Sequence, residues 1–398
     1  MKSKFDARQW QLDTQLIRGG TRRSQWGETS EAIFMNSGFC YEAAEVAESR
    51  FNGQAPGFVY SRYLNPTLAM LEDRLALMEG CERACVMASG MAAVFASLMC
   101  QLKAGDHVLA SKVLFGSCYY IVTQILPRFG ITYTLVEGHD AAAWEKAFKP
   151  NTACVFIETP SNPTLDIVDI AHVAKQCKKH GAKLIVDNVF STPLLQHPLK
   201  LGADIVVYST TKHIDGQGRC LGGAVLGSTE FIDTVLMPFH RHTGPALSPF
   251  NAWVILKGLE TLTLRVERHC SNAAKIADAL SQDKTIAKVM YPGLPSHPHY
   301  TVAKKQMDNG GPMIAFEVTG GKAGAFKFMN ALEVIDISNN LGDMKSLITH
   351  PATTTHSNIS AEERAGLGIT DGMLRLSVGT EHIDDLLKDI QRGLKAAK

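Results

Sequence analysis

Short apolar runs alternate with amphipathic segments between about residue 83 and residue 228. The apolar runs are rich in β-branched side chains, which is typical of buried strands. They are residues 84–88, 107–111, 131–137, 153–159, 183–187, 204–208 and 223–227. Amphipathic segments such as residues 170–180 predict helices between the strands. This alternation predicts an α/β fold with a doubly wound, mostly parallel sheet.

The pattern becomes helical from about residue 246. Residues 249–259 and 262–280 predict a long connecting helix that leads into a second, smaller unit. In that unit we expect strands at 287–291, 313–318 and 373–378, and helices at 323–332, 361–367 and 383–397. Strands and helices mixed in this way predict an α+β domain.

Residues 1–60 show little regular periodicity, and glycines interrupt them. Such a segment is expected to be an extended arm that rests on another surface. We therefore divide the chain into an N-terminal arm at residues 1–62, a large domain at 63–255 and a C-terminal α+β domain at 256–398. The arm is expected to contact a neighbouring subunit.

The composition is that of an ordinary globular enzyme. The chain has 398 residues, of which 45% are hydrophobic and 20% are charged. Lys and Arg number 40 against 39 Asp and Glu, a net charge of +1, so charge offers no reason to expect nucleic acid or an acidic membrane as partner.

Nine cysteines are scattered along the chain, an odd number without a CxxC pair. This pattern fits reduced thiols in a cytoplasmic protein. The first residues lack the apolar core of a signal peptide, and no uncharged apolar stretch reaches transmembrane length. We therefore expect a cytoplasmic protein with no membrane partner.

Lys212 follows the predicted strand 204–208 and a run of hydroxyl residues, and a glycine-rich loop comes next. A lysine at the mouth of a buried strand is poorly hydrated, which lowers its pKa and frees its amine as a nucleophile. Ser209 and its neighbours could hold a phosphate. These features suggest a Schiff-base lysine serving pyridoxal phosphate. The alternative is a solvated surface lysine.

Asp187 ends the apolar run 183–187. Ligands bind at the carboxyl ends of strands in open α/β sheets, so Asp187 and Lys212 are expected to open onto one crevice. A carboxylate there can keep a pyridine nitrogen protonated, which makes the ring an electron sink. Asp187 could instead cap a following helix.

Three further segments could contact the phosphate or ring. Gly90 and Met91 open an apolar helix after a strand, where amides and the helix dipole attract anions; a plain N-cap is the alternative. Tyr60 and Arg62 precede a likely helix at 67–78, and arginine grips phosphate bidentately; a helix lead-in is the other interpretation. Asn162 lies in a loop with two prolines after a strand, which could also be a simple turn.

Arg375 stands inside an apolar strand, LRLSV. A buried charge needs an anionic partner. An internal aspartate or a substrate carboxylate would both satisfy it.

Two other kinds of site are excluded. Gly216, Gly218 and Gly222 lead into a strand and have the wrong spacing for dinucleotide binding. The histidine pairs in the second half of the chain have no cysteine or carboxylate at ligand spacing, so we expect no metal.

Taken together, YSRYLNPT, SGMAA, ETPSNPT, VDNVFSTP, YSTTKH and LRLSVGTE resemble the Cys/Met-metabolism family of pyridoxal-phosphate enzymes. The motifs follow the family order and cover nearly the whole chain. The resemblance implies the aspartate-aminotransferase-like fold, fold type I, with the cofactor in the large domain. It also implies a homotetramer built as a dimer of dimers with shared active sites.

The resemblance implies a role for each matching residue. Lys212 would form the Schiff base and shuttle protons, and Asp187 would pair with the pyridinium nitrogen. The phosphate would be bound from the same subunit by Gly90, Met91, Ser209 and Thr211, and from the neighbouring subunit by Tyr60 and Arg62. Asn162 and Arg375 would contact the ring oxygen and the substrate carboxylate.

Two departures from the family pattern concern the substrate. Phe115 stands where most members carry a tyrosine that stacks over the ring; it can stack but has no phenol to act as acid or base. Asn340 begins NLGD where the family has SLGD. The stretch 349–356, which contains Thr355, and the Phe-Gly motif are similar to those of the family's O-succinylhomoserine sulfhydrylases. We count Phe115 among the catalytic residues, and Asn340 and Thr355 among those that contact substrate.

An acyl carboxylate leaves without a strong acid, whereas expelling a thiolate profits from one. Phe115 therefore favours γ-replacement on O-succinyl-L-homoserine by sulfide, giving L-homocysteine and succinate. The alternatives are γ-elimination, as in methionine or cystathionine γ-lyase, and the reactions of O-acetylhomoserine sulfhydrylase or cystathionine γ-synthase. A cofactor-binding protein without turnover is a third possibility.

Overall fold

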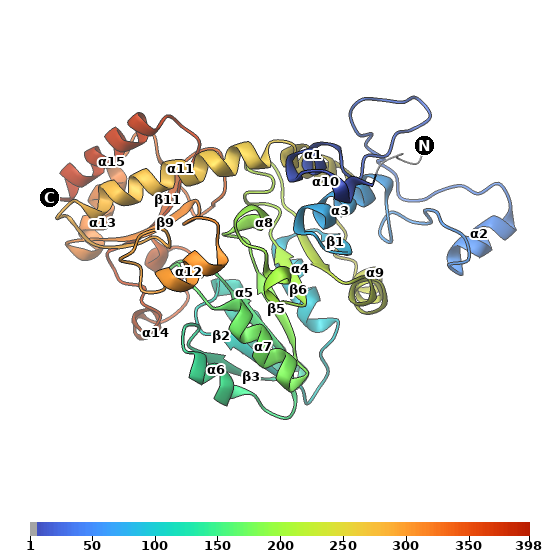
Figure 1. Ribbon diagram of the computed structural model, residues 1–398, viewed down its shortest axis with the longest axis horizontal. Helices are drawn as coiled ribbons and strands as arrows, with labels where there is room; N and C mark the ends of the chain where they lie inside the picture. The colour runs from blue at the N-terminus through green and yellow to red at the C-terminus, as the bar shows by residue number, and fades with distance from the viewer. Residues whose placement is uncertain (1–5) are drawn as a thin grey trace. The chain divides into compact units, whose positions relative to one another are not determined.

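The computed structural model describes residues 6–398 (Figure 1). The chain forms two compact units. The first contains residues up to Gln101 together with Val207–Asp215 and Arg219–Thr261, and the second contains Leu102–Val206, Gly216–Gly218 and Leu262–Lys398. The larger sheet has the strand order β1-β7-β6-β5-β4-β2-β3. Its strand β6 (Ile205–Tyr208) belongs to both units, because they divide after Val206.

The first unit is built around the long helix α3 (Pro66–Glu79), which is buried along most of its length. Asn65 caps the helix by accepting a hydrogen bond from the Thr67 amide, and Pro66 occupies the first turn, where no amide donor is needed. Gly80 ends the helix in the left-handed conformation, which glycine adopts without strain.

Strands and further helices accompany α3 in this unit. Strand β1 (Arg83–Met87) pairs antiparallel with β7 (Gly223–Gly227), so this end of the larger sheet departs from the parallel arrangement. The helices are α4 (Gly90–Met99), α9 (Met237–Thr243) and α10 (Pro249–Leu259).

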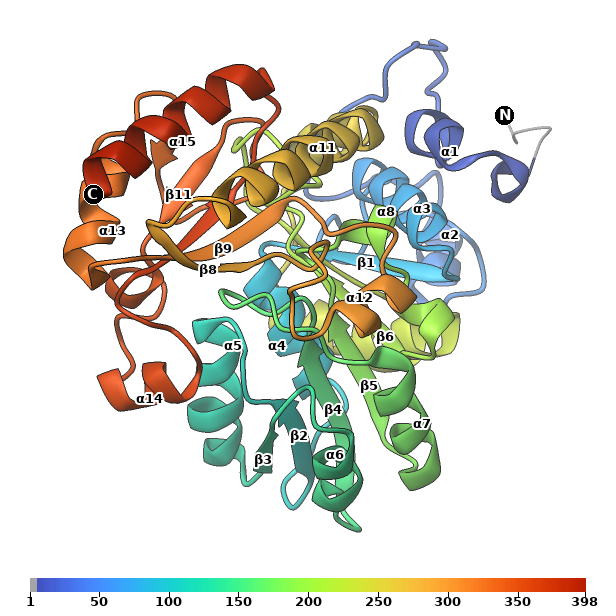
Figure 2. The same ribbon diagram turned by 60° about the vertical axis from the view of Figure 1, so that its left-hand side comes forward.

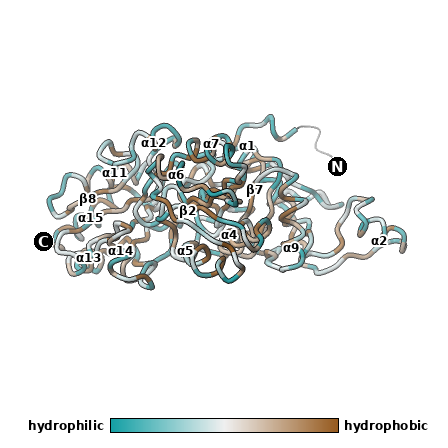
Figure 3. The backbone as a smooth tube through the Cα atoms, turned by 90° about the horizontal axis from the view of Figure 1, so that it is seen from below, coloured by the Kyte–Doolittle hydropathy of each residue, from teal (hydrophilic) through white to brown (hydrophobic). Residues whose placement is uncertain are grey.

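The N-terminal segment contains two short helices, α1 (Leu12–Arg18) and α2 (Ala44–Phe51), where the sequence predicts little regular structure. Irregular chain joins them, with hydrophobic positions along it (Figure 3). Three apolar side chains of the N-terminal segment are largely exposed to solvent: Trp26 is 84% exposed, Met35 66% and Phe51 64%. These exposed apolar groups fit a segment that rests on another surface.

In the second unit the larger sheet is parallel. Strands β2 (His107–Ser111), β3 (Thr132–Val136), β4 (Thr152–Glu158) and β5 (Lys183–Asp187) lie in the order β5-β4-β2-β3. Helices α6 (Ala141–Ala147) and α7 (Ile170–His180) cover them with a core of Trp144, Val173, Leu184 and their neighbours. This arrangement confirms the predicted mostly parallel sheet.

The same unit holds a second sheet, of the order β10-β11-β12-β9-β8. Its strands are β8 (Ile286–Met290), β9 (Met313–Val318), β10 (Asp336–Ile337), β11 (Leu347–Thr349) and β12 (Met373–Ser377). Helices α11 (Leu262–Ser281), α13 (Gly321–Asn330) and α15 (Ile383–Ala397) pack against it (Figure 2). Most strand pairs here are antiparallel, as expected of the smaller α+β part.

Short helices complete the fold. They are α5 (Gly116–Tyr120), α8 (Thr192–Leu195), α12 (Tyr300–Gln306) and α14 (Ala361–Gly366). Within residues 6–398, no helix combines the length and the apolar character that crossing a membrane requires.

Candidate active site

The start of helix α4 lies directly against Ser209. A Cβ added to Gly90 would stand 2.6 Å from the Ser209 Cβ and 2.8 Å from its hydroxyl oxygen, a separation that real side chains do not reach. The Ser89 hydroxyl caps the helix by accepting a hydrogen bond from the Ala92 amide, and half-buried Met91 follows Gly90. The close approach brings a hydroxyl to a helix N-terminus, which is a setting that suits an anion.

Lys212 lies on a tight turn close to Ser209. Its amide donates a hydrogen bond to the Ser209 carbonyl at 3.2 Å, so the two residues are fixed close together, and Lys212 is half-buried. The Thr211 hydroxyl donates to the Gly222 carbonyl at 3.2 Å and accepts from the Gly222 amide at 3.0 Å. Gly90, Ser209, Thr211 and Lys212 thus share one region of the first unit.

Tyr60 and Arg62 lie in an aromatic and basic cluster with Tyr63 and Arg241. The Arg62 guanidinium lies over the Tyr60 ring at 5.4 Å and over the Tyr63 ring at 5.0 Å, and it donates to the Arg241 carbonyl. Tyr60 is exposed. The side chains of Tyr60 and Arg62 therefore lie near the end of the N-terminal arm.

Asp187 is buried at the carboxyl end of β5, opposite Glu158 at the end of β4. Burial raises the pKa of Asp187 to about 7, although its carboxylate accepts the Val189 amide at 3.1 Å. Side-chain atoms of Cys118, Glu158 and Asp187 lie within 4.8 Å of one another. Two acids this close cannot easily both be ionised, because like charges repel in a buried site.

Glu158 holds two predicted site residues by their backbones. One of its carboxylate oxygens accepts the Phe115 amide at 2.7 Å, and the other accepts the Asn162 amide at 2.9 Å. Glu158 is not among the site residues predicted from the sequence. The signal was present, since Glu158 is a lone acid at the end of an apolar strand, as Asp187 is.

Arg375 is almost fully buried on β12; its hydrogen-bond acceptors are neutral, and the Glu158 carboxyl acts on it through its charge. Its guanidinium donates to the Asn162 side-chain oxygen at 2.9 Å and to the carbonyls of Asn339 and Asn340 at 2.9 and 3.3 Å. Within residues 6–398 its Nε has no hydrogen-bond partner. Arg375 thus does not bond to an internal aspartate, and its Nε donor is left for an anion.

Thr355 stands beside the start of α5, the helix that Phe115 caps. A Cβ on Gly116 would meet the Thr355 carbonyl at 3.1 Å, and the Thr355 hydroxyl lies 2.9 Å from His356 Nδ1. Burial lowers the pKa of His356 to about 4, so this ring is neutral near pH 7. Asn340, half-buried, contributes its backbone carbonyl to Arg375.

The groups of each unit suit one part of pyridoxal phosphate. Because Gly90 has no Cβ, the start of α4 can approach the Ser209 hydroxyl closely, and the Lys212 amide is bonded to the Ser209 carbonyl. Buried Asp187 suits a ring nitrogen, and the open Arg375 donor suits a carboxylate. When bound, the cofactor supplies an electron-withdrawing ring that stabilises negative charge on the carbons of an amino-acid substrate.

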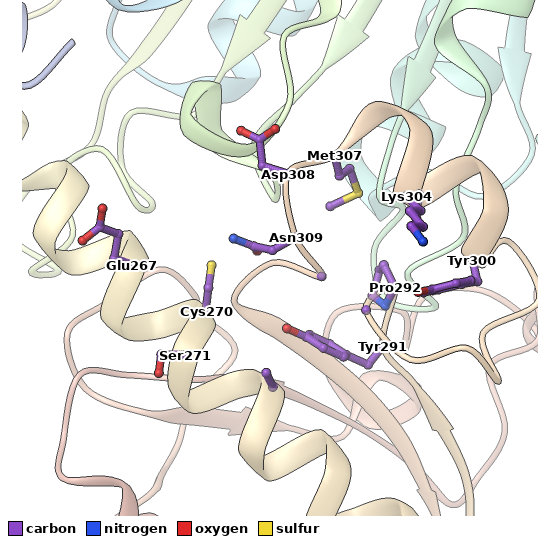
Figure 4. A pocket seen from close by; sticks show the side chains of 14 residues that line it. Glu267, Cys270, Ser271, Tyr291, Pro292, Tyr300, Lys304, Met307, Asp308 and Asn309 are labelled. Carbon is purple, nitrogen blue, oxygen red and sulfur yellow. The ribbon is translucent and has the colours of Figure 1, made fainter. Parts of the chain in front are cut away.

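A separate pocket of about 740 Å³ lies between α11 and the segment around α12 (Figure 4). Its lining includes Glu267, Cys270, Tyr291, Lys304 and Asp308. None of the predicted site residues lines it. This pocket is therefore not where the candidate site residues lie.

Comparison with known proteins gives the family. The model of the Cys/Met metabolism PLP-dependent enzymes matches residues 13–395. The chain is 52% identical over 382 residues to an O-succinylhomoserine sulfhydrylase of Mycobacterium tuberculosis (strain CDC 1551 / Oshkosh), covering 95% of this chain and 94% of that one. It is 41% identical over 383 residues to an L-methionine gamma-lyase of Porphyromonas gingivalis (strain ATCC BAA-308 / W83), covering 96% of each.

Among solved structures, the chain is similar to cystathionine gamma-lyase from Lactobacillus plantarum complexed with L-serine. The TM-score is 0.91 at 36% identity, with 98% of this chain and 99% of that chain covered. The predicted fold is therefore correct. On the match along its sequence, the shared fold and the motifs that the fold brings together, the chain belongs to the Cys/Met metabolism family of PLP-dependent enzymes.

Proposed function

We propose that this enzyme replaces the succinyl group of O-succinyl-L-homoserine with sulfide, giving L-homocysteine and succinate. The observation that carries the proposal is the 52% identity, over nearly the full chain, to a sulfhydrylase of this substrate. Phe115 supports it, because a phenylalanine supplies no proton to a leaving group and a carboxylate leaves without one.

In this reaction the chain's own residues hold the groups and move protons. Lys212 carries the cofactor and, once its amine is free, takes the Cα proton of the substrate and returns a proton to the carbon chain. Asp187 keeps the ring nitrogen charged. Arg375 uses its open Nε donor and its rigid fork to orient the substrate carboxylate.

The phosphate is held by Gly90, Met91, Ser209 and Thr211. Phe115 would stack on the ring and cover one of its faces, Asn162 would contact the ring oxygen, and Asn340 and Thr355 would line the substrate side. This leaves Lys212 as the main proton carrier, since the position of the usual phenol is apolar.

The assembly is proposed to be a homotetramer, a dimer of dimers, in which Tyr60 and Arg62 bind the phosphate of a neighbouring subunit. The exposed apolar side chains of the N-terminal segment support this, because they need cover. The location is proposed to be the cytoplasm, in keeping with nine cysteines that are all free thiols.

Gamma-elimination is the second candidate, favoured by the 41% identity to a methionine gamma-lyase. The two reactions share the removal of the Cα proton by lysine and differ in whether a thiol is added afterwards. A lyase would release 2-oxobutanoate from methionine or cystathionine without added sulfide.

The test is a side-by-side assay of the purified, cofactor-loaded protein. O-Succinyl- and O-acetylhomoserine are each offered with sulfide and with cysteine, and the products are separated. We expect homocysteine from the succinyl ester and sulfide, faster than any release of 2-oxobutanoate, and no product from Lys212→Ala. The proposal is overturned if neither ester yields homocysteine.

A further inference from the structure

Glu158 is a buried acid, 5% exposed, at the carboxyl end of β4. Resting on the proposed function, we infer that Glu158 is a positioning residue: by binding the backbone amides of Phe115 and Asn162 at once, it sets the Phe115 ring and Asn162 relative to Asp187. Glu158 therefore affects the reaction through Phe115 and Asn162 and does not itself contact the substrate.

The two hydrogen bonds join separate parts of the chain. Phe115 stands at the N-terminal end of α5, 43 residues before Glu158, and Asn162 lies in the loop four residues after it. A single carboxylate therefore ties the segment that carries the ring to the segment that carries the asparagine. Because each oxygen serves one amide, neither segment can shift without losing a hydrogen bond.

The hydrogen bonds continue to Arg375, the residue proposed to bind the substrate carboxylate. The Asn162 side-chain oxygen accepts from Arg375 Nη1 at 2.9 Å, so the chain of contacts runs from Glu158 through Asn162 to Arg375. Arg375 has no salt bridge to lock it from another side within the described residues, and its other hydrogen bonds go to backbone carbonyls. The orientation of the guanidinium thus depends on where Asn162 is held.

Glu158 also lies close to Asp187. Glu158 and Asp187 face each other across the β4–β5 register, and Cys118 lies against both. Burial and the Asp187 carboxylate raise the pKa of Glu158 well above its usual value, while the two amides and the Arg375 charge oppose that shift. A proton residing on Glu158 would leave the charge on Asp187, where the ring nitrogen needs it.

The test substitutes the carboxylate without emptying its volume. In Glu158→Gln one carboxylate oxygen is replaced by an NH2 group, which cannot accept a hydrogen bond from an amide. Either Phe115 or Asn162 therefore loses its backbone hydrogen bond to residue 158. We expect the cofactor to remain bound but its visible circular dichroism band to fall by about half. We expect kcat/KM for the acylhomoserine to fall by about tenfold to a hundredfold, since a displacement near 1 Å has effects of that size.

Glu158→Asp is the second variant. Its side chain is one methylene shorter and reaches one amide but not both, so its band and its kcat/KM should lie between those of the wild type and Glu158→Gln. This variant keeps the carboxyl group, and it serves the test even where Glu158→Gln does not fold.

Asp389→Asn is the matched control. Asp389 is a buried carboxylate on α15 that accepts the amides of Glu333, Val334 and Ile335 at 2.8 to 3.0 Å, and it is not among the site residues. It should lose thermal stability as Glu158→Gln does but leave the band and the kinetics within about twofold of wild type, as expected for a purely structural contact.

Three outcomes separate the possibilities. A changed band and lowered kcat/KM in the Glu158 variants, with an unchanged control, support the inference. Normal bands and kinetics in both Glu158 variants, or equal changes in Asp389→Asn, overturn it. A wild-type protein that binds the cofactor and shows no turnover of either acylhomoserine refutes the proposed function instead, and the band of Glu158→Gln still tests the positioning.

Discussion

Burial controls how single ionisable side chains of this protein behave. Glu72 on α3 is 7% exposed and its carboxylate accepts the Val86 amide at 3.0 Å. Burial raises the pKa of Glu72 from 4.5 to about 7, and neither the Val86 hydrogen bond nor nearby Arg83 offsets it. The folded protein therefore prefers the protonated acid more strongly than the unfolded chain does.

The sign of the pH dependence follows from that preference. Because the folded pKa is above the unfolded one, Glu72 favours folding below about pH 4.5 and loses this contribution as pH rises through about 7. Glu72→Gln cannot ionise, so its stability relative to wild type should improve between pH 5 and pH 8, by on the order of 3 kcal/mol at most. Thermal unfolding midpoints of both proteins across this range measure it; a constant difference between them would contradict the expectation.

Gly90 gives a second prediction at the scale of one residue. Gly90→Ala places a Cβ 2.6 Å from the Ser209 Cβ, so the start of α4 must move away from Ser209. We expect cofactor affinity, measured by visible absorbance on titration, to fall by at least about tenfold, which is the loss of roughly one hydrogen bond to a charged group. Gly366→Ala, which meets no atom within 4 Å, is the control and should bind as wild type does.

At the scale of the element, a buried ion pair pins the N-terminal segment to α3 and α10. Glu31 accepts hydrogen bonds from Arg74 at 2.7 Å, from Lys257 at 3.0 Å and from Thr21 at 3.2 Å. Burial by itself would raise the Glu31 pKa, but the hydrogen bonds from Arg74 and Lys257 outweigh it and bring the pKa to about 2. Asp73, which lies on α3 next to Arg74, forms an exposed ion pair with Arg22 that has no such burial.

Glu31→Gln should therefore destabilise the protein by about 3 to 5 kcal/mol, because Arg74 is left buried without its partner. Asp73→Asn, which breaks the exposed pair, should cost less than about 1 kcal/mol. Urea unfolding of the two variants measures the difference. Since the folded pKa of Glu31 is depressed, its contribution is complete above about pH 4.5 and is lost as pH falls toward about 2. Equal costs for the two variants would contradict a buried pinning role.

At the scale of the whole molecule, a single chain is expected to be an incomplete enzyme. Lys212→Ala and Arg62→Ala should each be inactive alone. Mixed, unfolded and refolded together, they should regain about a quarter of wild-type activity, since about half of the dimers are mixed and each mixed dimer has one intact site of two. Sedimentation checks that the oligomers are the same size. No recovery on mixing would mean that Arg62 serves its own chain.

How far the sequence predicts the structure depends on the length and regularity of each pattern. Helix α7 lies at residues 170–180 as expected, because Asp169 caps its start, Gly181 ends it and its apolar face is regular. Helices α1 and α2 were not predicted from the sequence, because they are short and α2 has no buried residue to give it a periodic apolar face. Burial patterns over few residues carry too little signal to separate such helices from loops.

The candidate site shows the same limit. A lysine and an acid at strand ends, and a glycine at a helix start, are visible along the chain because each occupies the carboxyl end of a predicted strand. Glu158 has that signal too, but its importance lies in which two amides it accepts, and those belong to residues 43 earlier and four later. Contacts between separate segments leave no periodicity in a single sequence.

The amino-acid sequence by itself determined that this protein has an α/β fold with a mostly parallel sheet and a smaller α+β part, and it predicted a Schiff-base lysine, because strand periodicity and the residue types at strand ends are local properties. Only the tertiary structure decided that Gly90 touches Ser209, that Arg375 bonds Asn162 while keeping one donor open, and that Glu158 is shared between Phe115 and Asn162. Those facts depend on packing across segments, where the fold and not the pattern sets which atoms meet.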